Sequence, residues 1–572
     1  MLPDVTGLDK AFDYAVPPRW HDAIQPGSIV RVPLHGRSVR GWIVDIDPAD
    51  QPVASGRLRE LTKVASLGPS TELIELAGWA SVRWAAGRLR PFLHAASPPV
   101  NIAVRPPADH RRPDGAPIAP DAADLVRAGG GVLRWPPNDE LRSVVAAAGS
   151  CGPTLVVAPA VDSARRLAVS LRRAGWSVAL VPEEWARAAG GVDLVIGTRT
   201  AVWAPCPGLA AIVVLDEHDE AHQDERSPTW HARDVAIERA RRAGVPVLLV
   251  SPCPTLVGQH ALGGVVTRRP VDDERASWPI VEIVDRGDDE PWKTSLVTSR
   301  LIRELRDHDR TVICVHNTPG RARLLACRSC RALVRCATCD AAVGLDDGGR
   351  LACRRCGTVR PPVCLACGAG SFANLRPGVT RLREELEAAA GRPVLAVTGR
   401  DDHDPAPAGV YVGTEAVLHR VQRADVVAFL DIDGELLAPR YRAAEQTMAL
   451  LVRAARRVGR RERGGRILVQ TFLPDHEVLR AAVLADPGRP IPAELARREL
   501  LRLPPFAALA TVSGTGAETF VSDLRGDGRV EIGGDDPFLV RADSWSDLGR
   551  ALIATPRPKG SRLRLAVDPP RA

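Results

Sequence analysis

The sequence predicts a multidomain α/β protein. We expect a β-rich N-terminal module, two lobes built on parallel sheets, a cysteine-rich insertion in the second lobe and a small α+β C-terminal domain. Three observations support this. The chain has 572 residues, which is too long for a single core. Short apolar runs alternate with helical stretches in two separate regions. Eight of the 12 cysteines form four Cys-x-x-Cys pairs between Cys327 and Cys367.

Residues 1–98 are predicted to form the first unit. The segment "GSIVRVPLHGRSVRGWIVDID" predicts two strands joined at a His-Gly-Arg turn, because apolar residues alternate on both sides of that turn. Residues 99–122 are rich in proline, alanine and charge, which is typical of a linker. The β-rich module is therefore expected to be joined to the rest of the chain through a segment without regular structure.

A first α/β lobe is predicted over residues 123–265. Its strands are expected to be buried on both faces, because short continuous apolar runs are typical of parallel sheets. Helical stretches such as "HARDVAIERARRAG" separate these runs. The predicted strands are "TLVVAPA" (154–160), "VDLVIGT" (192–198), "AAIVVLDE" (210–217) and "VPVLLVSP" (245–252).

A second lobe is predicted to begin within residues 266–326, where "TVICVHN" (311–317) is a strand. The cysteine-rich segment, residues 327–370, interrupts it, and residues 371–478 complete it. A C-terminal domain is expected over residues 479–572. The later strands of the second lobe are "PVLAVTG" (393–399), "GVYVGTE" (409–415), "DVVAFLDID" (425–433) and "GRILVQTF" (465–472).

Charge and targeting features favour an intracellular protein. The formal net charge is +7 and the pI is about 8.9, which permits binding to nucleic acid. No apolar run approaches the roughly 18 residues that would suggest a membrane span. The start of the chain, "MLPDVTGLDKAFDY", lacks the apolar core of a signal peptide. We therefore expect a cytoplasmic protein with no membrane partner, whose cysteines stay reduced.

The four Cys-x-x-Cys pairs predict two closed sites of four thiolates each, the shell of structural zinc. Such sites leave no position for a catalytic water. Disulfides, scattered core thiols and an iron–sulfur cluster are the alternatives. The spacing permits three ways of matching four pairs into two sites, and it does not choose among them. The other cysteines, Cys151, Cys206, Cys253 and Cys314, are expected to be buried core thiols.

Two α/β lobes in tandem are typical of a nucleotide-driven motor, which needs a phosphate loop of the form G-x-x-x-x-G-K-[ST]. The corresponding segment, "GGGVLRWPPNDELRSVVAAAG" (129–149), has no Gly-Lys pair, and no lysine occurs between Lys63 and Lys293. Arginine does not replace the loop lysine. Pro136 and Pro137 also remove two backbone donors. We therefore expect no usual ATP binding or cleavage, and we assign no catalytic or cofactor-binding residue.

Several segments resemble the PriA family of primosomal replication-restart proteins over nearly the whole chain. The resemblance rests on "AFDYAVP" and the His-Gly-Arg hairpin, on "DEHDEAHQDERSPTWHARDVAIERA" (216–240), and on the cysteine segment. It also rests on "VGTEAVLHR", "DIDGELLAPRYRAAEQTMALLVRAARRVGR" (431–460), "LLRLPPF" (500–506) and the closing "RLRLAVDPP". The departures from the family's pattern are the missing phosphate loop, the shortened acidic motif, "SPCPT" (251–255), and Glu415 in place of a glutamine.

The resemblance implies a helicase-like fold for the two lobes, and it implies specific ligand sets. The outer pairs, Cys327, Cys330, Cys364 and Cys367, would bind one zinc ion. The inner pairs, Cys336, Cys339, Cys353 and Cys356, would bind the second. The N-terminal module would bind the 3′ end of a nascent DNA strand. Its candidate contacts are Phe12, Asp13, Tyr14, Gly36 and Arg37.

Each of these residues also has a structural interpretation. Phe12 and Tyr14 would then be half-buried at a strand end, and the Gly36–Arg37 turn would be a solvated hairpin tip. Asp216 and Glu217 are interpreted as relic or structural carboxylates. The arginines from Arg456 to Arg461 could form a former arginine finger, a DNA contact or a solvated face.

The function implied is that of a replication-restart factor. It would bind stalled or abandoned forks and promote primosome assembly and reloading of the replicative helicase, without helicase activity of its own. Its partners would be branched or forked DNA, other primosome proteins and the single-strand DNA-binding protein. It would be located at the nucleoid. The alternatives are an active ATP-dependent 3′-to-5′ helicase and a zinc-ribbon interaction scaffold.

Overall fold

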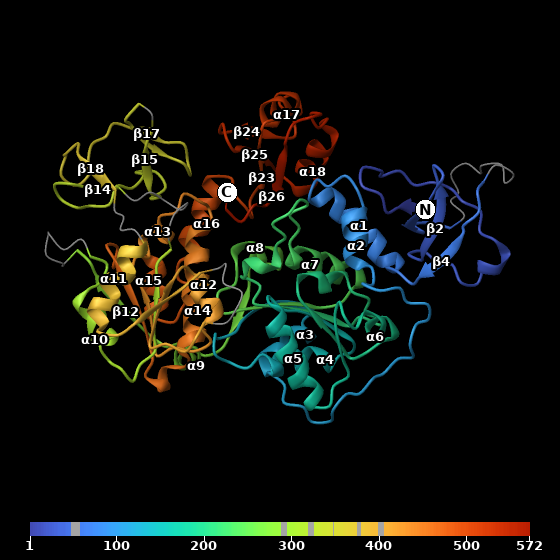
Figure 1. Ribbon diagram of the computed structural model, residues 1–572, viewed down its shortest axis with the longest axis horizontal. Helices are drawn as coiled ribbons and strands as arrows, with labels where there is room; N and C mark the ends of the chain where they lie inside the picture. The colour runs from blue at the N-terminus through green and yellow to red at the C-terminus, as the bar shows by residue number, and fades with distance from the viewer. Residues whose placement is uncertain are drawn as a thin grey trace.

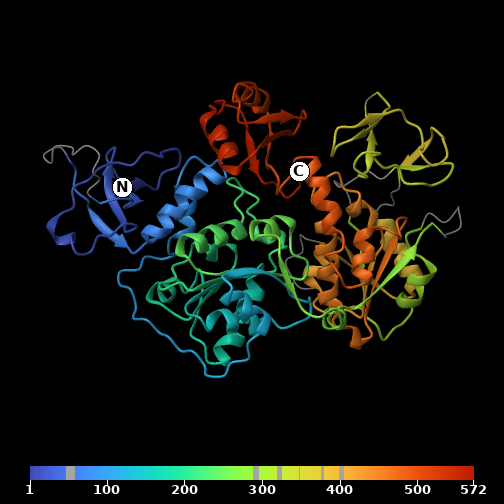
Figure 2. The same ribbon diagram turned by 180° about the vertical axis from the view of Figure 1, so that it is seen from behind.

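The computed structural model describes residues 1–46, 58–287, 295–317, 325–346, 348–374, 379–398 and 405–571. Figures 1 and 2 show two central lobes side by side, with the N-terminal module against the first lobe and the cysteine module against the second. The C-terminal domain lies over the junction of the lobes. Lys293 lies outside the described residues. No described helix is long and apolar enough to cross a membrane.

The N-terminal module contains a four-stranded antiparallel sheet of order β1-β3-β2-β4. The predicted hairpin is confirmed: Leu34 pairs with Arg37, and His35 and Gly36 form the turn with φ of 47° and 75°. Val30 and Val32 are buried while Arg31 is exposed, so the alternation of the sequence places one face on the core. The elements are β1 (Leu2–Pro3), η1 (Pro18–Trp20), β2 (Ile29–Leu34), β3 (Arg37–Trp42), β4 (Lys63–Ser66), α1 (Thr71–Arg83) and α2 (Arg90–Ala96).

The first lobe is a seven-stranded parallel sheet of order β11-β5-β10-β9-β6-β8-β7. The four predicted strands are confirmed as β6, β8, β9 and β10. The strands are β5 (Gly130–Arg134), β6 (Thr154–Val157), β7 (Val178–Leu180), β8 (Leu194–Gly197), β9 (Ala211–Leu215), β10 (Val247–Ser251) and β11 (Val266–Arg268). The helices are α3 (Pro120–Arg127), α4 (Arg142–Gly149), α5 (Val161–Arg173), α6 (Trp185–Gly190), α7 (Ala232–Ala243), α8 (Leu256–Ala261) and α9 (Val271–Ser277), with η3 (Arg199–Trp203) and η4 (Glu220–His222).

The second lobe is a six-stranded parallel sheet of order β12-β22-β21-β13-β20-β19. All five predicted strands are confirmed, and β12 is an additional one. The strands are β12 (Ile280–Asp285), β13 (Val312–Val315), β19 (Val394–Val397), β20 (Val410–Gly413), β21 (Val426–Phe429) and β22 (Arg466–Thr471). The helices are α10 (Ser299–Leu305), α11 (Val379–Ala390), α12 (Ala416–Arg420), α13 (Asp433–Leu436), α14 (Ala443–Val458) and α15 (Glu477–Val483), with η5 (Arg461–Arg463).

The cysteine module is inserted between β13 and β19 and holds two small antiparallel sheets. Its strands are β14 (Leu325–Cys327), β15 (Val343–Leu345), β16 (Leu351–Cys353), β17 (Val359–Arg360) and β18 (Phe372–Asn374). The C-terminal domain is a four-stranded antiparallel sheet with helices. Its elements are α16 (Ile491–Leu500), β23 (Ala508–Ser513), α17 (Ala517–Leu524), β24 (Glu531–Gly533), β25 (Phe538–Ala542), α18 (Trp545–Ala554) and β26 (Arg564–Val567).

One of the predictions about core thiols is wrong. Cys206, Cys253 and Cys314 are buried as expected, but Cys151 is exposed. Cys151 follows the last turn of α4 in a turn at the lobe surface, where the chain leads into β6. The apolar run beside it therefore indicated a buried neighbourhood that the thiol itself does not share.

Candidate functional site

The loop between β5 and α4, residues 135–141, lies where a motor would hold nucleotide phosphates. This loop is fastened to elements outside the first sheet. The Asn138 side-chain amide donates to the Ser277 carbonyl at 2.8 Å and to the Ala455 carbonyl, at the end of α14, at 3.3 Å. The Asp139 carboxylate accepts from Arg460 at 2.8 Å and also pairs with Arg269. The loop is therefore joined to the second lobe by side-chain hydrogen bonds and an ion pair.

Arg456 makes the central contact between the two lobes. Its guanidinium donates two hydrogen bonds to the Asp216 carboxylate, at 2.5 and 2.6 Å, across 240 positions of sequence. Its Nε donates to the Pro137 carbonyl at 3.1 Å. A planar guanidinium that meets a carboxylate through both arms gives the strongest kind of protein ion pair. We call this arrangement, together with the Asn138 and Asp139 contacts, the inter-lobe clasp.

The backbone conformation and the ionisation state of Asp216 both favour its pairing with Arg456. It follows β9, is 5% exposed, and adopts a left-handed φ of 52°, which aspartate tolerates better than most residues. Burial is the largest single influence on the pKa of Asp216 and would raise it, but the charge and hydrogen bonds of Arg456, together with the charge of His218, hold the pKa below its ordinary value. The carboxylate is therefore ionised and already matched by a cation of the second lobe.

The carboxylate of Glu217 is also paired with neighbouring side chains and backbone. Its carboxylate pairs with Arg233 at 3.0 Å, and the exposed fractions of the two side chains are 0% and 1%. It also accepts from the backbone N–H of Thr255 at 3.0 Å and from the Thr255 hydroxyl. In a motor, the acidic residues at this point hold magnesium and orient water. Here the contacts of Asp216 and Glu217 match the structural interpretation of both carboxylates.

The two lobes are held together by contacts beyond the clasp. Asp219 pairs with Arg453 of α14 at 3.3 Å, and the backbone N–H of Leu256 donates to Glu445 at 2.7 Å. Asp568, which is 0% exposed, accepts from Arg442 at 2.7 Å, and its carbonyl accepts from Gln223 at 2.6 Å. The tail of the chain thus bonds to both lobes.

The structure resolves what the basic run at 456–461 does. Arg456 pairs with Asp216 and Arg460 with Asp139, while Arg457 donates to Gln422 within its own lobe. Arg456 is therefore not part of a solvated face, whereas the Arg460 side chain is 44% exposed although it pairs with Asp139. Asn138, Asp139, Arg233 and Asp568 were not singled out from the sequence. Their partners lie far away along the chain, and no local spacing signals such pairs.

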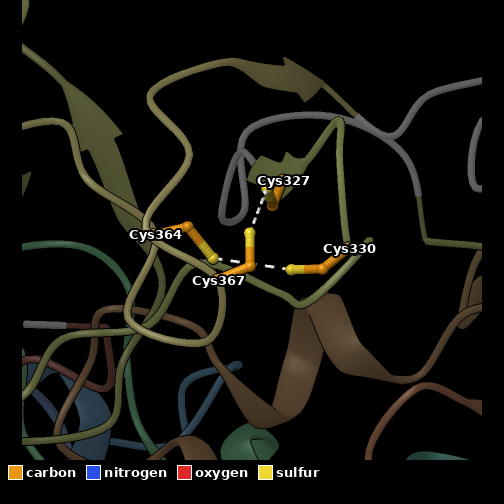
Figure 3. A group of neighbouring side chains, drawn as sticks. All are labelled: Cys327, Cys330, Cys364 and Cys367. Carbon is orange, nitrogen blue, oxygen red and sulfur yellow. Dashed lines mark hydrogen bonds between the residues drawn. The ribbon is translucent and has the colours of Figure 1, made fainter.

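The eight paired cysteines form two clusters of four sulfurs, each with all Sγ atoms within 4.8 Å of one another. The clusters are Cys327, Cys330, Cys364 and Cys367 (Figure 3), and Cys336, Cys339, Cys353 and Cys356. Of the three matchings that the spacing permits, the structure brings together the outer pairs and the inner pairs. This is the matching that the family resemblance implies.

The sulfur distances test whether a metal fits. Within the clusters, Cys327 and Cys367 lie 3.5 Å apart, Cys330 and Cys364 3.6 Å, and both Cys336–Cys356 and Cys339–Cys353 3.5 Å. A disulfide requires about 2.05 Å. A tetrahedral shell with Zn–S bonds of about 2.3 Å has edges of roughly 3.8 Å. The sulfurs therefore lie at a spacing that fits a metal ion and does not fit a disulfide.

Arg355 fixes the cysteine module to the second lobe. Its guanidinium donates to the carbonyls of Ala438 and Arg440 at 2.8 and 2.9 Å, and to the carbonyl of Cys339 at 3.2 Å. The backbone N–H of Ala342 adds a bond to the Leu437 carbonyl at 2.8 Å. One arginine thus links a cluster cysteine to the segment that follows α13. This contact orients the module on the lobe.

The candidate DNA contacts of the N-terminal module lie near each other. Asp13, Gly36 and Arg37 are exposed, and Phe12 and Tyr14 are half-buried. The Tyr14 hydroxyl donates to the Pro33 carbonyl at 3.2 Å, two residues before the hairpin turn. This hydrogen bond ties the Phe12–Tyr14 segment to the hairpin. The two groups therefore belong to one surface.

Replacing Arg456 with glutamine should lower the free energy of unfolding at neutral pH by about 3–5 kcal/mol, because Asp216 keeps its buried charge without a partner. The pKa of Asp216 is lowered in the folded state, so its stabilising contribution is present above the unfolded-state pKa and is lost as pH falls through the folded-state pKa. The difference in the free energy of unfolding between wild type and R456Q, measured by urea denaturation, should therefore shrink as pH falls below about 5.

The matched control is Arg457→Gln, one residue further along α14, because Arg457 donates to Gln422 and forms no ion pair among the described residues. Its stability should stay within about 0.5 kcal/mol of wild type. If the difference in the free energy of unfolding between wild type and R456Q does not change with pH, the clasp does not depend on the charge of Asp216.

Comparison with known proteins agrees with this structure. Residues 2–98 match the model of the 3′DNA-binding domain of PriA. The chain is 30% identical to the probable replication restart protein PriA of Mycobacterium tuberculosis over 577 residues, covering 89% of this chain and 85% of that protein. The Mycobacterium leprae protein of the same name is 28% identical over 639 residues, covering 98% and 96%.

More distant relatives match over a shorter stretch. The replication restart protein PriA of Bacillus subtilis is 27% identical over 372 residues, so the chain spans about half of its length, 46%, and 60% of this chain is aligned. A solved structure of the helicase MrfA bound to DNA and AMPPNP superposes with a TM-score of only 0.34 at 11% identity, covering 78% of this chain and 64% of that one. Together with the fold and the cysteine clusters, the mycobacterial matches show that the chain belongs to the family of replication restart proteins PriA.

Proposed function

We propose that this protein is a replication-restart factor that recognises branched or forked DNA without acting as a helicase. It binds stalled or abandoned forks and promotes primosome assembly and reloading of the replicative helicase. The observation that carries the proposal is the inter-lobe clasp. Arg456 and Asp216 pair with each other at the position where a motor needs side chains that are free to bind nucleotide and magnesium.

The N-terminal module supplies DNA recognition in this proposal. Asp13 accepts a hydrogen bond from the terminal 3′-hydroxyl or a base edge, and Phe12 or Tyr14 stacks on a base. Gly36 and Arg37 meet a phosphate through a backbone N–H and the guanidinium. The exposure of Asp13, Gly36 and Arg37 supports these roles. Phosphate contacts dominate such binding, so affinity falls as salt rises.

The cysteine clusters hold two zinc ions in this proposal, and the metal supplies only cross-links between strands and turns. Each closed four-thiolate shell leaves no position for substrate. The module then presents a rigid surface to other primosome proteins and to the single-strand DNA-binding protein.

The division of labour follows the chain. Residues 1–98 bind the DNA end and 99–122 link. The first lobe begins at 123 and extends past the predicted boundary at 265, because β11 pairs with β5 in its sheet. The second lobe continues to 478 with the module at 327–370, and 479–572 join both lobes. In this scheme the protein works at the nucleoid, in the cytoplasm. An active helicase with a divergent nucleotide site, and a scaffold without a DNA role, are the outcomes that the tests below would reveal.

Purified protein should contain two zinc ions per chain, as measured by plasma mass spectrometry, because the four-sulfur clusters number two. The double variant Cys336→Ser, Cys339→Ser should keep one, since only the inner cluster loses ligands. Cys151→Ser is the matched control, because this exposed thiol lies outside both clusters. Iron in place of zinc, with the visible absorption of an iron–sulfur cluster, would overturn the assignment.

The fork hypothesis is tested by equilibrium binding to a fork with a free 3′-hydroxyl and to linear duplex of equal length. Wild type should prefer the fork. Asp13→Asn should weaken fork binding roughly tenfold, the equivalent of losing a hydrogen bond to a charged acceptor of about 1.5 kcal/mol. Asp22→Asn, an exposed aspartate of the same module, should have no effect. Equal affinity for fork and duplex would refute fork recognition.

Adding ATP and magnesium to the same assay separates the motor alternative. We expect no change in fork affinity and no fork-stimulated phosphate release. ATP turnover that rises with fork DNA in wild type, and disappears in a variant of Glu217, would establish a helicase-type cycle. A protein that binds zinc and protein partners but no DNA would instead be a scaffold.

A further inference from the structure

A shallow cavity on the first lobe is lined almost entirely by arginine. It has a volume of about 480 Å³ and lies between the start of α4 and the exposed face of α5. We call it the arginine hollow. Its lining residues are Arg142, Arg165, Arg166, Val169, Ser170 and Arg173.

The arginine hollow differs in charge from three other cavities among the described residues. The inter-lobe cavity includes Glu217, the cavity beneath the cysteine module includes Asp340, and the cavity beside Arg134 includes Asp486. No carboxylate lines the arginine hollow. In the described part of the chain, neither Arg166 nor Arg173 forms an ion pair. Both side chains are exposed, so these two arginines present positive charge to the solvent.

Helix geometry explains why the charges converge. Arg165, Val169 and Arg173 are spaced four residues apart along α5, so they lie on one face of the helix. Arg142 reaches this face from the first position of α4 and donates to the Ser170 hydroxyl at 3.5 Å. Its own carboxylate partner, Glu140, is 61% exposed, so that pairing is weak.

The positive field extends to the second lobe. Burial, and then the charges of Arg456, Arg166 and Arg453, lower the pKa of Arg457 to about 10. Arg166 therefore lies within electrostatic range of α14. Because the inter-lobe clasp fixes α14 against the first lobe, the arginines of the two lobes keep a constant arrangement.

We propose that the arginine hollow is a second DNA contact, which holds the phosphate backbone of a duplex arm. This inference rests on the proposed DNA-binding function and assigns that function a second site on the protein. Guanidinium groups recognise phosphates through paired N–H donors. A site for single strands would combine basic groups with aromatic side chains for stacking. No aromatic residue lines the hollow, so the duplex backbone is the ligand that matches it.

The position of the hollow favours a different arm from the one at the N-terminal module. Figures 1 and 2 show α4 and α5 on the side of the first lobe that faces away from the C-terminal domain, while the N-terminal module lies at the end of the molecule beside α1 and α2. One DNA end at the module and one duplex arm at the hollow therefore occupy separate surfaces. Two such surfaces on one rigid body can select for branched DNA.

The test is the double variant Arg166→Gln, Arg173→Gln. The matched control is Arg127→Gln, Arg241→Gln, which removes the same charge from two exposed arginines that already have carboxylate partners, Asp124 and Glu238. Affinities are measured over a range of salt concentrations for linear duplex, for a fork with duplex arms, and for single-stranded DNA. Thermal unfolding of each variant checks the fold, and R166Q and R173Q are also measured singly.

Each phosphate contact that is lost should reduce the slope of log affinity against log salt by about 0.9. The magnitude of this slope should therefore fall by about 2 in the double variant on both duplex substrates. It should fall by about 1 in each single variant and stay unchanged in the control. Binding to single-stranded DNA should stay unchanged.

An unchanged slope on linear duplex would overturn the inference, and so would an equal loss on single strands. A synthetic polyglutamate peptide is the third probe. If wild type binds it and the double variant does not, while duplex binding is kept, the hollow takes an acidic peptide and the proposal is wrong. Failure of fork recognition alone is distinct, because the linear duplex tests the hollow whether or not wild type prefers forks.

Discussion

The ion pair between Arg456 and Asp216 determines what the two lobes can do. It joins the end of α14 to the end of β9, and it includes the loop that would otherwise surround phosphates through the Pro137 carbonyl. Separating the lobes would leave Asp216, which is 5% exposed, without its cation. Breaking a buried pair in this way costs several kcal/mol. A motor instead opens and closes its lobes as ligands bind and leave. Here the second lobe's own guanidinium supplies the cation, so closure needs no ligand.

The remaining inter-lobe contacts extend this constraint to the rest of the molecule. Asp568 joins the C-terminal tail to Arg442 and Gln223, so the C-terminal domain spans both lobes. Arg355 holds the cysteine module on the second lobe through carbonyls of the chain after α13. Because each link is a short, directed hydrogen bond, the module and the domain keep a fixed position once the lobes are closed. The cysteine module and the C-terminal domain are thus both bonded to the lobes that the clasp joins.

The sequence predicted the parts of the structure that depend on local pattern. The strands from β6 to β10 that have long apolar runs were found, and so was the hairpin around Gly36. β5 was missed because it begins with two glycines and ends with Arg134, and β7 was missed because it has only three residues. The cysteine pairs were evident from spacing, but their matching needed either a resemblance or the structure. Cys151 was placed in the core from its apolar neighbours, although it lies in a surface turn.

The clasp could not have been predicted from the sequence, and the reason is physical. Arg456 lies in a run of arginines that are chemically alike, and only the fold decides that Arg456 meets Asp216 while Arg457 meets Gln422. The same holds for Asn138, whose partners are two backbone carbonyls. A sequence can show that a phosphate loop has lost its lysine, but it cannot show what the loop contacts instead.

A closed pair of lobes has a consequence for how a fork is distinguished from a duplex. In the proposed function, which involves no nucleotide turnover, selectivity comes from binding alone, as a difference in free energy between correct and incorrect DNA. Two weak contacts on one rigid body provide that difference, because the second contact forms at a high effective concentration only when the DNA has the right geometry. Linear DNA satisfies one contact, and a branched molecule satisfies both. In this proposal, the contact of Arg456 between the lobes is what lets selectivity for DNA shape arise without a motor.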